Sequence, residues 1–212
     1  MEYVINILFV VIVFLNLMIL GTIKIDLMIR FVVFQGIILS VLPLVFEGLE
    51  VPNITMAVLM FIIKGIAIPS LLYKAMSGVR IKREDSPNIG STASMLLGLA
   101  ITGISLVLAG KYIPQNPETH PMIIPIGIST FVAGVILLVS RRKAFTQVIG
   151  YLVFDNAIFI FGMLIVSKMQ FVVEMGILLD LLVCIFIMGI VLHDIAEHYT
   201  SLDTRKMNYL KE

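Results

Sequence analysis

Three ionisable residues stand near the middle of long apolar stretches of the sequence: Lys64, Asp155 and Asp180. A charge at the centre of a membrane costs roughly 2.5–3.5 kcal/mol on insertion scales, so such residues normally face a bundle interior or a hydrated path. A carboxylate removed from water gains affinity for protons, and a nearby cation lowers that affinity. One lysine and two aspartates could therefore load and release a proton. The alternative is a lysine–aspartate pair that only holds helices together.

The neighbours of two of these residues favour a functional site. Asn156 follows Asp155 directly. Pro69 comes five residues after Lys64, and because proline has no backbone N–H, the carbonyl of Gly65 should lose its helical partner. A free carbonyl beside a charge can admit water into a membrane helix. We therefore expect a break in the helix that carries Lys64.

A further acid, Glu174, begins the last apolar stretch near the predicted outer surface. It could form the outer end of a proton path, or it could be an interfacial acid whose side chain reaches water. These residues together make up the predicted site. The proton-path candidates are Asp180, Asp155, Lys64 and Glu174, and the supporting polar residues are Asn156 and Gln35.

The elements that must position these residues are membrane-spanning helices. The chain has 212 residues, of which 59% are hydrophobic and 14% are charged, and its mean hydropathy is +1.08. An ordinary soluble domain has roughly 45–50% apolar and 25% charged residues. Within lipid, backbone hydrogen bonds have to close inside helices. The composition therefore predicts an all-α integral membrane protein in the lipid bilayer.

Seven apolar stretches approach the length of about 20 residues that a spanning helix needs. We expect residues 1–192 to form a single seven-helix transmembrane domain and residues 193–212 to form a cytoplasmic C-terminal tail. The predicted spans are Tyr3–Leu20, Ile25–Phe46, Ile54–Ala75, Ser91–Gly110, Met122–Ser140, Phe145–Val166 and Phe171–Leu192.

A weak internal repeat relates two parts of the chain. FVVFQGIIL at residues 31–39 can be laid on YLVFDNAIF at residues 151–159, which places Gln35 against Asp155. The segment around Lys64 can likewise be laid on the segment around Asp180. The matched spans are four apart and so point the same way, as a parallel duplication requires. The pattern suggests a repeated three-helix unit, helices 1–3 and 5–7, although identities are few.

Basic residues predict the orientation, because loops rich in lysine and arginine stay in the cytoplasm. One predicted side carries only Lys111 and Lys168. We therefore expect the N-terminus outside and the C-terminus in the cytoplasm. The basic residues of the predicted cytoplasmic side are Lys24, Arg30, Lys74, Arg80, Lys82, Arg83, Arg141, Arg142, Lys143, Arg205, Lys206 and Lys211.

We expect no catalytic, cofactor-binding or metal-binding residue in this chain. Cys184 is the single cysteine, which excludes an internal disulfide and an iron–sulfur cluster held by this chain alone. The sequence has no Ser–His–Asp order, Gly-rich phosphate loop or paired cysteine motif. A net charge of +1 gives no indication of a nucleic-acid partner.

The segments RRKAFTQVIGYLVFDNAIFIFG and GILLDLLVCIFIMGIVLH resemble the last two helices of the K subunit of respiratory complex I. They are similar also to the C subunit of multisubunit cation/proton antiporters. Those relatives have three spans, whereas the seven-span layout and the Asp155–Asn156 pair look more like hydrogenase-4 component E. The resemblance covers the chain loosely and residues 141–193 more specifically.

The resemblance implies roles for individual residues. Asp180 stands where the complex I subunit has the glutamate of its third helix, which belongs to a line of charges implicated in proton translocation. The glutamate of the second helix would fall near Leu152, whereas the acid here is Asp155, about one turn further along. Lys64 has no counterpart in the three-span relatives and resembles, by residue type alone, the lysines of antiporter-like subunits.

The resemblance also implies a function and partners. It points to a non-catalytic membrane-arm subunit of a hydrogenase or formate hydrogenlyase type complex, in the inner (plasma) membrane of a prokaryotic cell. Such a subunit would work with other membrane subunits, which carry the electron chemistry. One alternative is a subunit of a multisubunit cation/proton antiporter without redox chemistry. Another is a free-standing transporter of a small solute, for which the chain is short and lacks a polar cluster of suitable size.

Overall fold

All regular secondary structure in the described part of the chain is helical. The computed structural model describes residues 2–78, 87–112 and 120–163, together with the single residues Gly176, Asp180 and Gly189. No strand occurs among these residues, and six helical stretches are long and apolar enough to cross a membrane. The expected all-α architecture is therefore confirmed for this part. The predicted seventh span, Phe171–Leu192, and the tail at residues 193–212 fall outside it, apart from the three single positions.

The helices agree closely with six of the predicted spans. The third span is made of three consecutive helical segments, because a π-helix interrupts it. The helices are α1 (Glu2–Gly21), α2 (Ile25–Glu47), α3 (Val51–Met60), η1 (Phe61–Ala67), α4 (Ile68–Gly78), α5 (Ser91–Tyr112), α6 (Ile123–Ser140) and α7 (Ala144–Gly162).

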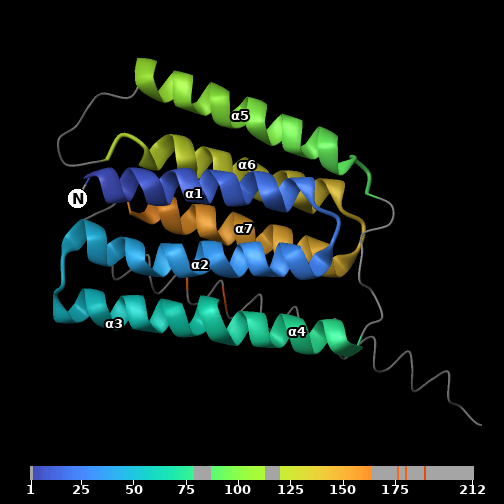
Figure 1. The fold of residues 1–212 in the computed structure, drawn as a ribbon, viewed down its shortest axis with the longest axis horizontal. Coiled ribbons are helices and arrows are strands. Elements are labelled where there is room, and N and C mark those ends of the chain that lie inside the picture. The colour runs from blue at the N-terminus through green and yellow to red at the C-terminus, as the bar shows by residue number, and fades with distance from the viewer. Residues whose placement is uncertain are drawn as a thin grey trace, which may run out of the picture.

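The six stretches lie side by side with α3, η1 and α4 at one edge and α5 at the other (Figure 1). Helices α1, α2, α6 and α7 lie between these edges, and α6 packs most extensively against α7. Helix α7 is the most buried of the six spans, and α5 is the least buried. Helix α7, which carries Asp155, therefore lies inside the bundle, and η1, which carries Lys64, packs against α2 at its edge.

Glycine permits the close approach of α6 and α7. A Cβ atom at Gly134 would lie 2.7 Å from the backbone nitrogen of Phe154, a distance that real Cβ contacts do not reach. A Cβ at Gly150 would lie 2.8 Å from Leu137 Cβ on the opposite helix. Small residues commonly allow membrane helices to pack backbone against backbone. This contact fixes the position of α7, which carries Asp155.

Connections at one end of the bundle are held by a buried arginine. Arg141 is only 1% exposed, and its Nη2 donates to the carbonyl oxygens of Leu20 at 3.0 Å and Thr22 at 3.3 Å. These carbonyls belong to the last turn of α1 and the connection after it, where backbone acceptors lack helical partners. Arg142 Nε donates to Asn88 Oδ1 at 2.5 Å at the same end. Three connections predicted to be cytoplasmic therefore lie together.

An aromatic cluster occupies the opposite end. The ring of His120, before α6, lies 5.6 Å from the ring of Phe9 and 6.1 Å from that of Phe46, between centroids. Its Nδ1 accepts a hydrogen bond from the backbone N–H of Met122 at 3.3 Å. Burial lowers the pKa of His120 below its ordinary value, while the negative charge of Glu2 partly opposes that shift. The histidine thus packs as a partly buried ring against Phe9 and Phe46.

Candidate functional site

Lys64 and the two predicted aspartates come together inside the bundle. Lys64 Nζ donates to Asp155 Oδ2 at 2.5 Å and to Asn156 Oδ1 at 2.9 Å. Asp180 Oδ1 lies 4.0 Å from the same nitrogen, which is within ion-pair distance but too far for a hydrogen bond. Each of the four residues is at most 6% exposed. Four of the predicted site residues therefore form one buried cluster, which we call the charged cluster, and its role in proton transfer stays a prediction.

Lys64 lies in the middle of the π-helix η1. At the end of this segment the N–H of Ile68 donates to the carbonyl of Ile63, five residues back. Pro69 follows immediately and has no N–H to continue the usual ladder. The predicted break beside Lys64 therefore exists, but it takes the form of a widened helical turn. Single π-turns inside α-helices often occur at functional sites.

The neighbouring helices leave room for the lysine side chain. A Cβ at Gly36 of α2 would lie 2.9 Å from Lys64 Cβ, so only glycine lets α2 approach η1 this closely. The ring of Phe159 on α7 has its centroid 5.8 Å from Lys64 Nζ. An ammonium at this distance from an aromatic face is attracted by the ring quadrupole. Apolar packing and an aromatic face thus enclose the charged cluster.

The charged cluster has a surplus of negative formal charge. Its ionisable groups within the described residues are the ammonium of Lys64 and the carboxylates of Asp155 and Asp180. The ammonium can balance one carboxylate, and a second buried carboxylate without a counterion is costly. A bound proton or another monovalent cation would remove the surplus. The arrangement is therefore chemically suited to take up and release one positive charge.

Gln35 belongs to a series of hydrogen-bonded polar side chains next to the charged cluster. Gln35 Nε2 donates to Asn16 Oδ1 at 3.1 Å, and Asn16 Nδ2 donates to Thr130 Oγ1 at 2.9 Å. Gln35 Oε1 is buried and accepts no hydrogen bond from any residue that the structure describes. Gln35 directly precedes Gly36, which packs against Lys64. This series of hydrogen-bonded side chains therefore begins beside the charged cluster. Gln35 was predicted from the sequence to support the site, whereas Asn16 and Thr130 were not.

The polar groups of these helices lie at one level between two apolar clusters. One cluster lies toward the end of the bundle that contains Arg141 and includes Ile19, Ile29 and Leu137. The other lies toward the end that contains His120 and includes Phe9 and Leu39. Along each helix the polar residue comes between members of the two clusters. We call this set the polar layer; its members are Asn16, Gln35, Lys64, Ser129, Thr130, Asp155 and Asn156.

The polar layer continues to the peripheral helix α5. Thr102 Oγ1 and Ser129 Oγ share a hydrogen bond of 2.6 Å between α5 and α6. Ser105 Oγ donates to the carbonyl of Pro125 at 3.1 Å. A pattern in the sequence points to these residues, since almost every apolar stretch contains an isolated polar residue at similar depth. Comparing those depths across the helices would have found them.

On α7, Asp155, and not Leu152 almost one turn earlier, lies at the depth of Lys64. Leu152 is 3% exposed and belongs to the apolar cluster that contains Ile19, Ile29 and Leu137.

Glu174, the fourth predicted proton-path residue, lies outside the described part of the chain. Within residues 2–78, 87–112 and 120–163 and the three single positions described beyond them, no group of three or more His, Cys, Asp or Glu residues could hold a metal ion. The fold and the site thus define an all-helical membrane protein with a buried charged cluster.

Comparisons with known proteins add one distant relative. The chain is 21% identical over 188 residues to a protein of Mycobacterium tuberculosis named "Uncharacterized protein Rv0085", and the match covers 87% of this chain and 85% of that protein. No family model matches the chain. No solved structure matches it either. The similarity over nearly the full length of both proteins carries no activity with it, so the function has to be argued from the site.

Proposed function

We propose that the chain is a membrane-arm subunit of a complex I-like energy-converting hydrogenase or formate hydrogenlyase type complex, in which its buried charges take part in proton translocation. The observation that carries this proposal is the charged cluster of Lys64, Asp155, Asn156 and Asp180 inside a bundle of apolar helices. Ionisable residues within a membrane are costly and usually mark ion pathways. The resemblance of residues 141–193 to complex I-type subunits supports the choice of complex.

The charge balance of the cluster supports a role in proton handling over a purely structural role. A lysine and one aspartate would suffice to join two helices. The second carboxylate, Asp180, adds a charge that Lys64 does not neutralise and that makes no hydrogen bond to it at 4.0 Å. A site that only stabilises packing gains nothing from this surplus, because an uncompensated buried charge is destabilising.

The proposed location is the plasma membrane of a prokaryotic cell, with the N-terminus outside and the C-terminal tail in the cytoplasm. Arg141, Arg142 and the connection at Thr22 lie at one end of the bundle. Cytoplasmic connections are the ones enriched in arginine and lysine. The redox chemistry would belong to other subunits, and this chain would be non-catalytic and hold no cofactor of its own.

The proposal is tested with Asp180→Asn in the intact complex, isolated through an affinity tag on this chain. Proton uptake into sealed vesicles, electron-transfer rate and subunit composition are measured on the same preparation. Asp26→Asn is the matched control, because Asp26 carries the same charge but lies 40% exposed in a surface pair with Arg30 at 3.0 Å. We expect Asp180→Asn to lower the number of protons moved per electron, while composition and the control stay unchanged.

Three results would overturn the proposal. If the proton uptake per electron is unchanged in Asp180→Asn, the charged cluster does not lie on the proton path. Copurification of cation/proton antiporter subunits without any redox subunit would assign the chain to the antiporter class. Isolation of the chain alone, under conditions that preserve membrane complexes, would favour a free-standing transporter.

A further inference from the structure

Lys64 occupies the position that a bound metal cation would take in the charged cluster. Three oxygen atoms surround its Nζ: Asp155 Oδ2 at 2.5 Å, Asn156 Oδ1 at 2.9 Å and Asp180 Oδ1 at 4.0 Å. Two carboxylates and an amide carbonyl are oxygen ligands of the kind that hard cations such as Na⁺ prefer. The set is therefore a cation site whose centre is filled by an ammonium group of the chain itself.

We propose that Lys64 is a tethered cation that excludes Na⁺ from this site and so makes the site specific for protons. The proposal rests on the proposed function, since it names the ion that the charged cluster handles. An ammonium and a sodium ion carry the same charge and compete for the same oxygen atoms. The ammonium is attached to η1, so its local concentration at the site far exceeds that of a free ion.

With the ammonium of Lys64 in place, the cluster can still bind a proton but offers too few free oxygen ligands for a metal ion. Asp180 Oδ1 is buried and accepts no hydrogen bond from the residues that the structure describes. A proton on that oxygen needs no further coordination. A sodium ion would need several oxygen ligands, and Asp155 and Asn156 already accept hydrogen bonds from Lys64. Asp180 can therefore neutralise the surplus charge by protonation while Lys64 stays in place.

Room to displace the ammonium is also lacking. Gly36 of α2 packs against the lysine stem, where even a Cβ atom would lie 2.9 Å from Lys64 Cβ. Phe159 covers the ammonium from α7, with its ring centroid at 5.8 Å. The side chain is 6% exposed. Lys64 is thus confined to its position between the two carboxylates.

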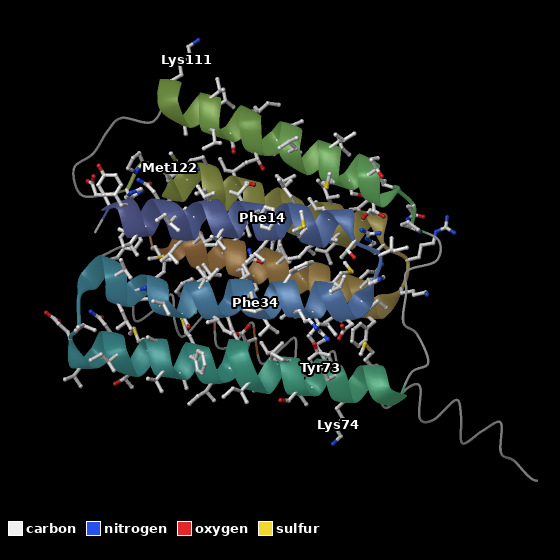
Figure 2. The ribbon with its side chains drawn as sticks, viewed as in Figure 1. Phe14, Phe34, Tyr73, Lys74, Lys111 and Met122 are labelled. Carbon is white, nitrogen blue, oxygen red and sulfur yellow. The ribbon has the colours of Figure 1, made fainter. Side chains whose placement is uncertain are left out.

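The test is equilibrium binding of radioactive Na⁺ to the purified full-length chain in detergent, with choline as the replacement ion. Lys64→Met removes the tethered charge, Lys64→Gln does so while keeping a polar group, and Lys64→Arg keeps the charge. Lys111→Met is the matched control, because Lys111 lies exposed at the end of α5 and points away from the bundle (Figure 2). Size-exclusion chromatography and circular dichroism establish that each variant is folded.

We expect saturable Na⁺ binding in Lys64→Met and Lys64→Gln, and no saturable binding in the wild type even at Na⁺ concentrations about tenfold higher, a factor typical of coupling between two ligands. Adding Asp155→Asn to Lys64→Met should abolish this binding. Lys64→Arg and Lys111→Met should behave as the wild type. Saturable Na⁺ binding by the wild type at the affinity of Lys64→Met would overturn the proposal, as would its absence from both folded neutral variants.

The binding measurement is independent of the proposed function. It needs neither partner subunits nor proton movement, so an unchanged proton uptake in Asp180→Asn would leave its outcome as it stands. If the neutral variants fail to fold, the wild type and Lys64→Arg still decide, because Na⁺ binding to either one contradicts exclusion by a tethered cation.

Discussion

Removal of Asp155 should have opposite effects on stability depending on whether Lys64 is present. In the wild type, Asp155→Asn removes the carboxylate that accepts a hydrogen bond from Lys64 at 2.5 Å. A hydrogen bond to a charged group contributes about 1.5–3 kcal/mol, and Asp180 at 4.0 Å remains to balance the ammonium. We therefore expect Asp155→Asn to lower the free energy of unfolding by about 1.5–3 kcal/mol.

The same substitution should be neutral or stabilising in a Lys64→Met background. Lys64→Met leaves two buried carboxylates without their cation, and breaking a buried pair in this way costs about 3–5 kcal/mol. Asp155→Asn then removes one of two like charges, and the double variant should be no less stable than Lys64→Met alone. The coupling energy between the two substitutions would be on the order of 2–3 kcal/mol, at the upper end for contacting residues.

This double-mutant cycle is measured by unfolding in mixed micelles with increasing dodecyl sulfate, followed by circular dichroism. Asp26→Asn, which lies in an exposed ion pair, is the control in both backgrounds and should change stability little. Equal destabilisation by Asp155→Asn in both backgrounds would refute the reasoning, because additive effects mean that the two residues do not interact energetically.

Three further predictions concern the α6–α7 contact and the two ends of the helix bundle. Gly134→Ala should destabilise the α6–α7 contact by about 1–3 kcal/mol in the same unfolding assay, whereas Gly103→Ala, with open space at its Cβ, should be neutral or stabilising. Arg141→Met removes donors to the Leu20 and Thr22 carbonyls and should cost about 2–3 kcal/mol; an unchanged unfolding midpoint would contradict the bonding. Because burial lowers the pKa of His120, thermal stability should fall as pH drops below the ordinary value of 6.5, and His120→Gln should flatten that dependence.

Much of the fold could be predicted because lipid imposes simple rules on a sequence. Apolar length alone located the six described spans, since every spanning segment has to close its backbone hydrogen bonds as a helix. The same rule made Lys64, Asp155 and Asp180 conspicuous, because each interrupts an apolar stretch. That the lysine and the aspartates lie close together agrees with a physical expectation, because a buried charge is stabilised by a neighbouring charge of opposite sign.

Other features depend on packing between helices and left only weak traces in the sequence. Pro69 indicated an irregularity near Lys64, but it could not reveal that the backbone widens into the π-helix η1. Asn16 and Thr130 look like ordinary polar residues of membrane helices until their mutual hydrogen bond is known. Arg141 was read as a basic residue of a cytoplasmic loop, whereas its burial against the end of α1 required the tertiary structure.

The central claim is that the charged cluster gains and loses a proton within the membrane. Infrared difference spectroscopy of the purified protein, titrated over the pH range in which it stays folded, measures this most directly. We expect a protonated carboxyl band that appears and disappears on titration, that is absent in Asp180→Asn and that is retained in Asp26→Asn. A spectrum in which Asp180→Asn and the wild type titrate identically would contradict the account.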